Sequence, residues 1–99
     1  MPEPKVVWFV YLLRCRDGTL YAGITTDVGR RVAQHNAGTA ARYTRSRRPV
    51  ALVYQVRASS RGDALRREAA LRKLSRDAKE ALIRTARRVG EREGPAAGP

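Results

Sequence analysis

Two apolar runs separated by a short polar turn make up the segment VVWFVYLLRCRDGTLYAGIT, residues 6–25. The first run, residues 6–13, is continuous and rich in β-branched and aromatic side chains, which is typical of a strand buried on both faces. The second run, residues 19–25, follows Arg16-Asp17-Gly18, a sequence that favours a turn. The segment therefore predicts a β-hairpin at the start of the fold.

The length of the turn determines which faces of the hairpin Tyr11 and Tyr21 occupy. A two-residue turn would place them on opposite faces, whereas a three-residue loop at 16–18 places Tyr21 opposite Leu13 and both tyrosines on one face. A type I turn that ends in a left-handed glycine is the usual three-residue hairpin loop, so Gly18 favours the second register. We therefore predict both hydroxyls on one face, with two half-buried structural tyrosines as the commoner alternative.

The rest of the chain predicts three helices and one further strand. In order these are a helix from Thr26 or Asp27 to about Asn36 ended by Gly38, a basic loop at 39–49, a strand at 50–56, a helix from Ser59 or Ser60 to about Lys73, and a helix from Ser75 to about Val89 ended by Gly90. The predicted order is ββαβαα, an α+β layer sandwich. One domain at 6–89 lies between a polar lead at 1–5 and a flexible tail at 90–99.

The charge indicates a polyanionic partner. The 99 residues include 21 Lys and Arg against nine Asp and Glu, a formal net charge of +12, which suits nucleic acid first and an anionic membrane second. The sequence shows neither a membrane span nor a secretory signal pattern, so we expect a cytoplasmic protein. Cys15 cannot form an intramolecular disulfide, and Cys15 with His35 supplies too few ligands for a structural zinc site.

The positive charge is concentrated where acids are missing, since residues 28–62 contain eight arginines and no Asp or Glu. In the basic loop, arginines would bind phosphates and Tyr43 could stack on a splayed base. The alternative is a solvated basic loop. The candidate nucleic-acid-binding residues are Arg30, Arg42, Tyr43, Arg45, Arg47 and Arg48.

Two further positions are candidates for chemistry. On the first helix Arg31, Gln34 and His35 share a face beside the buried stripe, where Arg31 could stabilise charge on a phosphoryl group. The alternative is a surface arginine and a solvent-facing or helix-end histidine.

The second position is Glu68, which falls within the apolar stripe predicted for its helix from Ala64, Leu65, Leu71 and Leu74. A carboxylate there needs a cation, a metal or a shifted pKa. Glu68 therefore either forms a salt bridge with a neighbouring arginine or binds a hard divalent ion such as Mg²⁺.

In this order, Val10-Tyr11-Leu12, Tyr21-Ala22-Gly23, Arg31, His35 and Glu68 resemble the motifs of the GIY-YIG nuclease superfamily. The resemblance extends over residues 7–83. The spacing of these residues resembles that of the small single-domain bacterial branch and of the catalytic domain of structure-specific Holliday-junction resolvases. Two departures are the sequence Val-Tyr-Leu in the first motif and Ile24 after Gly23, where some relatives have lysine.

The resemblance implies a small three-stranded antiparallel sheet flanked by helices, and cleavage of phosphodiester bonds with one divalent ion, Mg²⁺ or Mn²⁺. It assigns Tyr11, Tyr21, Arg31 and His35 to catalysis and Glu68 to the metal. One tyrosine would orient or deprotonate the attacking water, and which of the two does so stays open.

The sequence hypothesis is therefore a metal-dependent DNA endonuclease for the repair or processing of branched or damaged strands. The main alternative is a non-catalytic DNA- or RNA-binding module on a GIY-YIG scaffold, and a weaker one is a domain that docks acidic partners. A domain this short would bind with little sequence preference or depend on a protein partner for specificity.

Overall fold

The two apolar runs form the antiparallel strands β1 (Trp8–Arg14) and β2 (Leu20–Thr25) in a computed structural model that describes residues 6–97, with side chains described as far as residue 87. Leu13 pairs with Tyr21, and Gly18 has the left-handed φ of 87°. The Cys15 N–H donates to the Thr19 carbonyl at 2.8 Å and closes the three-residue loop. The predicted register is confirmed, whereas the predicted lead at 1–5 lies outside the described residues.

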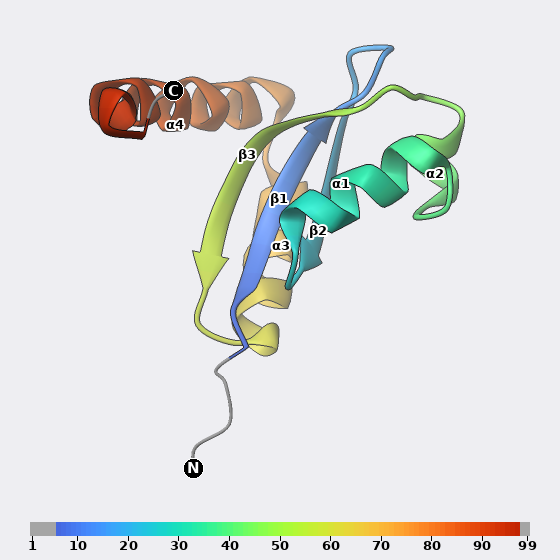
Figure 1. Ribbon diagram of the computed structural model, residues 1–99, viewed down its shortest axis with the longest axis horizontal. Helices are drawn as coiled ribbons and strands as arrows, with labels where there is room; N and C mark the ends of the chain where they lie inside the picture. Colours follow the sequence, from blue (N-terminus) through green and yellow to red (C-terminus); the bar gives the residue numbers. More distant parts are fainter. Residues whose placement is uncertain (1–5, 98–99) are drawn as a thin grey trace.

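A three-stranded antiparallel sheet forms when β3 (Ala51–Ala58) pairs with the other side of β1, giving the order β2-β1-β3. Because β1 is central and both faces of the sheet are covered, residues 10–13 are fully buried. Figure 1 shows α1 (Val28–Ala37) and α3 (Arg61–Lys73) on opposite faces of this sheet. The predicted α+β class and the order ββαβαα are confirmed.

The helix boundaries follow the predicted capping residues at Asp27, Gly38, Ser60 and Ser75. The Asp27 carboxylate accepts from the Arg30 N–H at 3.1 Å at the start of α1, and Gly38, with φ 82°, ends this helix. Ser60 caps α3 in the same way. The Ser75 hydroxyl accepts from the Ala78 N–H at the start of α4 (Arg76–Ala97).

Two boundary predictions are wrong. The predicted basic loop contains a short helix, α2 (Arg42–Arg45), whose first residue follows Ala41, a residue without a side-chain cap and hence without a start signal. The last helix does not end at Gly90 but continues to Ala97. A single glycine costs a helix about 1 kcal/mol relative to alanine, which by itself is too little to end a helix.

Each face of the sheet has its own apolar core. On the α3 face, Val10 and Leu12 pack with Ala64, Leu71 and Ile83 in the larger of the two core clusters. The stripe predicted on α3 is too wide, because Leu65 and Leu74 are 40% and 38% exposed.

On the α1 face, Tyr11 and Leu13 pack with Cys15 and Val50, and with the half-buried Tyr21 and Val32. Both predicted tyrosines therefore occupy one face, the face that carries α1 and α2. Among the described residues, no helix has both the length and the apolar character that a membrane crossing requires.

Candidate active site

Tyr11 and His35 form a buried polar pair at the centre of the α1 face. Their side chains are 1% and 0% exposed, and the Tyr11 hydroxyl lies 3.0 Å from the His35 Nε2. Gly23 is the β2 partner of Tyr11, and a Cβ atom at Gly23 would overlap the Tyr11 hydroxyl and ring. The glycine of the Tyr-Ala-Gly motif is therefore required by the close approach of the tyrosine ring to β2.

Thr44 of α2 determines which nitrogen of His35 carries the proton. The Thr44 Oγ1 lies 2.7 Å from the His35 Nδ1 and donates its own proton to the Ala41 carbonyl at 3.2 Å. Since a hydroxyl has a single proton, Thr44 must accept from an Nδ1–H. A neutral His35 then has a lone pair on Nε2, so the Tyr11 hydroxyl donates to His35.

Burial and charge keep both groups of this pair neutral. Burial, with a further contribution from the Arg31 cation, lowers the pKa of His35. Burial raises the pKa of Tyr11, while the nearby Arg31 guanidinium opposes this rise. At neutral pH His35 is therefore an uncharged proton acceptor that holds the proton of an un-ionised tyrosine.

Tyr21 extends this group toward the surface. Its ring meets the His35 ring edge-on, with centroids 5.3 Å apart, and stacks on Tyr43 at 5.6 Å. The Arg47 guanidinium lies 3.9 Å from the centre of the Tyr43 ring and bonds to Asp17 at 3.1 Å. Tyr43 and Arg47, both predicted to bind nucleic acid, thus also support the tyrosine face of the site.

Arg31 lies at the edge of a surface hollow of about 310 Å³ beside the end of β2. Its guanidinium donates to Gln34 at 3.0 Å, which holds the side chain along α1. The hollow is also lined by Arg30, Ile24 and Trp8. The Arg31 guanidinium can therefore contact an anion that enters the hollow from solvent. Its positive charge also acts on Tyr11, whose pKa burial raises and Arg31 lowers.

Glu68 approaches the site from α3, on the other face of the sheet. Its side chain is 13% exposed and accepts a 2.7 Å ion pair from Arg72, the neighbouring arginine that the sequence offered as its alternative partner. The Glu68 charge contributes to the raised pKa of Tyr11, so the two lie within electrostatic range. In the described part of the chain no three His, Cys, Asp or Glu side chains gather as metal ligands.

The model of the GIY-YIG catalytic domain matches residues 7–81 of this sequence. The chain belongs to the GIY-YIG family. The first two GIY-YIG motif segments are the paired strands that bring Tyr11 and Tyr21 onto one face. Arg31 and His35 follow on the helix that covers this face of the GIY-YIG domain.

Relatives of this GIY-YIG domain are found in bacteria and archaea. A UPF0213 protein of Desulfotalea psychrophila is 49% identical over 81 residues, which cover 81% of this chain and 74% of that protein. A UPF0213 protein of Halobacterium salinarum is 55% identical over 74 residues, 75% of this chain and 96% of that protein. The solution structure of an E. faecalis protein aligns with a TM-score of 0.58 at 41% identity, over 87% of this chain and 92% of that chain.

The structure brings some of the predicted site residues together and leaves others apart. Tyr11, Tyr21 and His35 are in direct contact, and Arg31 is beside them. Glu68 comes from α3 and is paired with Arg72, and its link to this group is its charge, which acts on Tyr11. The remaining predicted nucleic-acid contacts, Arg30, Arg42, Arg45 and Arg48, are exposed. Sequence reasoning missed Thr44, because a threonine in a loop without periodicity carries no signal of burial.

Proposed function

We propose that this GIY-YIG domain is a metal-dependent endonuclease that hydrolyses DNA phosphodiester bonds in the processing of branched or damaged strands. The observation that carries the proposal is the buried Thr44–His35–Tyr11 hydrogen-bond chain next to the Arg31 guanidinium. A proton acceptor and an anion-binding cation side by side suit hydrolysis of a charged ester.

In this proposal Tyr11 transfers a proton rather than acting as a free tyrosinate. The attacking water donates a hydrogen bond to the Tyr11 oxygen while Tyr11 donates to the His35 Nε2. As the water oxygen bonds to phosphorus, its proton moves to Tyr11 and the Tyr11 proton moves to His35. The bond from phosphorus to the leaving oxygen breaks, and this oxygen takes a proton from solvent. The relay avoids a tyrosinate, which the raised pKa of Tyr11 disfavours.

Arg31 would bind the non-bridging phosphate oxygens in this mechanism, and Glu68 would hold the metal. A single carboxylate fits Mg²⁺ or Mn²⁺, because such ions bind through one or two carboxylates together with water and phosphate oxygens. When bound, the ion supplies charge stabilisation for the phosphoryl oxygens. Ile24 contributes apolar packing to the core and no charge. The cations at the hollow are Arg30 and Arg31, and Arg31 is the one whose charge acts on Tyr11.

The substrate, the partner and the location belong to the same proposal. DNA is the preferred ligand, with RNA as the alternative, and the exposed arginines of α1 and α2 would contact the backbone. A protein partner would supply specificity, and we place the protein in the cytoplasm.

Cleavage of branched and supercoiled DNA by the purified protein with Mg²⁺ or Mn²⁺ tests the proposal. We expect Arg31→Gln and Glu68→Gln each to lower the cleavage rate by roughly 100-fold or more, because each removes a group that stabilises the transition-state charge. DNA binding measured in EDTA should persist in Glu68→Gln. As a matched control, Arg84→Gln removes an exposed arginine of α4 and should cleave like the wild type.

Cleavage that survives both site substitutions would refute the site assignment.

The Glu68–Arg72 ion pair is the observation that favours the alternative, a binding module, because it engages the proposed metal ligand. Wild-type protein that binds DNA and cuts none with either ion would establish that alternative.

A further inference from the structure

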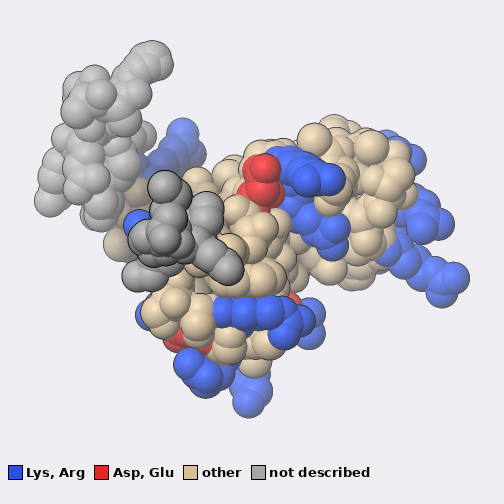
Figure 2. Space-filling model, turned by 60° about the horizontal axis from the view of Figure 1, so that its bottom comes forward, with Lys and Arg blue, Asp and Glu red and all other residues tan. Residues whose placement is uncertain are grey.

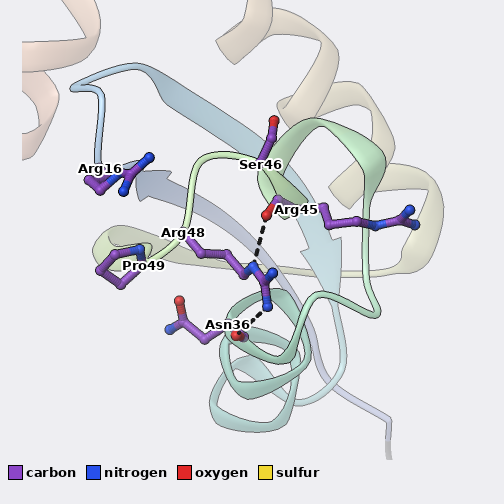
Figure 3. A pocket seen from close by; sticks show the side chains of 6 residues that line it. All are labelled: Arg16, Asn36, Arg45, Ser46, Arg48 and Pro49. Atoms are coloured by element: carbon purple, nitrogen blue, oxygen red, sulfur yellow. Dashed lines mark hydrogen bonds between the residues drawn. The ribbon is translucent and has the colours of Figure 1, made fainter.

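A second hollow lies on the molecule, lined by residues from three separate segments. Its volume is about 470 Å³, and Figure 3 shows the side chains around it. One lining residue comes from the β1–β2 loop, one from α1, and the others from α2 and the segment before β3. These residues are Arg16, Asn36, Arg45, Ser46, Arg48 and Pro49.

Arg48 is held in place at this hollow by two backbone carbonyls. Its guanidinium donates to the Arg45 carbonyl at 2.8 Å and to the Asn36 carbonyl at 3.4 Å, as Figure 3 shows with dashed lines. A Cβ atom at Gly38 would lie 2.8 Å from the Arg48 Nη1. Gly38 therefore leaves room for a guanidinium whose position is set before any ligand binds.

The hollow also contains hydrogen-bond donors that the protein does not use. Within the described residues, the side chains of Arg16 and Ser46 have no hydrogen-bond or ion-pair partner. By contrast, the Asn36 amide is engaged with both backbone groups of Val50, at 2.7 and 3.0 Å. In Figure 3 the Arg45 side chain extends away from Arg48, and the Ser46 hydroxyl also points away from Arg48. Arg16 and Arg48 are therefore the main donors, and Ser46 adds a hydroxyl at the rim of the hollow.

No acidic side chain lines this hollow. Asp17, next to Arg16 in the loop, is engaged by Arg47 at 3.1 Å. The backbone N–H of Arg16 donates to the Arg47 carbonyl at 2.9 Å, which fixes the loop against the segment before β3. Two arginines from different segments, with a hydroxyl and no nearby free carboxylate, are suited to a phosphate group.

The position of the hollow relates it to the proposed active site. Asn36 directly follows His35 on α1, and Arg45 directly follows Thr44 on α2. The hollow therefore borders the two segments that form the His35–Thr44 contact, and it shares no lining residue with the hollow beside Arg31. A DNA strand held at Arg31 could continue over α2 to Arg16 and Arg48.

We propose that the Arg16–Ser46–Arg48 hollow binds a backbone phosphate of the DNA strand at a distance from the bond that is cut. This subsite rests on the proposed function, which it deepens by assigning the path of the substrate. The subsite extends the proposed DNA-binding surface from the arginines of residues 28–62 to Arg16 in the β1–β2 loop.

Fluorescence anisotropy with a labelled four-way DNA junction in EDTA tests the subsite, because no cutting occurs without metal. We expect Arg16→Gln to weaken binding roughly fivefold and to make the slope of log K against log salt shallower by about 0.9, as for one lost duplex phosphate contact. Arg84→Gln has the same change in net charge and should leave affinity and slope unchanged. Arg16→Gln is the sharper variant, since Arg48 also bonds to two backbone carbonyls and its loss could affect folding.

Equal effects of Arg16→Gln and Arg84→Gln would overturn the subsite, because net charge alone would then explain them. Saturable binding of deoxyadenosine monophosphate at Arg16, tighter than that of the junction, would also overturn it by making the hollow a nucleotide site. The two proposals can fail separately. Wild-type protein that binds the junction and never cuts it refutes the endonuclease, and the Arg16 comparison still decides the subsite.

Discussion

At the scale of single residues, the candidate site depends on one hydroxyl proton. Thr44 donates to the Ala41 carbonyl, so it can only accept from His35, and His35 can only accept from Tyr11. All three side chains are buried, and among the described residues no buried side-chain polar atom lacks a hydrogen-bond partner. Such a chain has one consistent arrangement of protons, which is what a proton relay requires.

Replacing Thr44 by valine removes the acceptor of the His35 Nδ1–H and with it the contact that favours this tautomer. We expect Thr44→Val to reduce the free energy of unfolding by about 1–3 kcal/mol, the cost of a buried unsatisfied group. We also expect it to shift His35 from the Nδ1–H tautomer, as read from the ¹⁵N shifts of the ring. Thr44→Ser keeps the hydroxyl and should keep the tautomer. A tautomer that is identical in wild type, Ser and Val would contradict the role of Thr44.

At the scale of elements, one ion pair joins the sheet to the last helix. Arg14 at the end of β1 bonds to Glu80 of α4 through two contacts, at 2.8 and 2.7 Å. Arg76 adds a third at 3.0 Å. The hydrogen bond from Arg14 is the main reason why the pKa of Glu80 falls to about 2. In Figure 1, α4 extends away from the sheet, so this cluster lies where the helix is joined to the sheet.

The ion pair predicts how stability depends on pH. The pKa of Glu80 is about 2 in the fold against 4.5 for a free glutamate, so its contribution is fully present above about pH 4.5. This contribution is lost as the pH falls toward 2. In Glu80→Gln, the denaturant midpoint should be lower at pH 6 and should fall less steeply between pH 4.5 and 2. Asp77→Asn, on the first turn of the same helix, is the control. Equal pH slopes for wild type and Glu80→Gln would exclude the pair.

At the scale of the whole molecule, excess positive charge covers much of the surface. Figure 2 shows groups of Lys and Arg side chains with few acidic ones between them on one face. Several acids are already paired within helices or between segments, as in the contacts of Asp63 with Arg67 and of Asp17 with Arg47. The remaining arginines repel one another in the free protein, and a bound polyanion would relieve this repulsion.

The same repulsion predicts that salt stabilises the free protein. With a net charge of +12 on 99 residues, raising NaCl from about 20 to 200 mM shortens the screening length and should raise the thermal unfolding midpoint. Exposed ion pairs weaken with salt, but each contributes only about 0–1 kcal/mol. Circular dichroism melts at the two salt concentrations measure the shift. An unchanged or lower midpoint in high salt would mean that the ion pairs outweigh the repulsion.

Local chemistry made some of these features predictable. Gly18 defined the hairpin loop, and the loop length then defined the register and the shared face of Tyr11 and Tyr21. Caps at Asp27 and Ser60 act through their nearest backbone groups, so their effect is visible over three or four residues of sequence. The predicted end at Gly90 is wrong because a glycine inside a helix costs only about 1 kcal/mol and does not by itself decide where the helix ends.

The sequence by itself determined the hairpin, the order of elements, the excess of basic charge and the residues that match the GIY-YIG family. These follow from periodicity, turn chemistry and composition, which act between near neighbours. Only the folded chain shows the contact of Thr44 with His35, the ion pair of Glu68 with Arg72 rather than an open carboxylate, and the placement of Arg16 and Arg48 around one hollow. Side-chain hydrogen bonds and hollows depend on distances of a few tenths of an ångström, and packing sets those distances across the whole molecule.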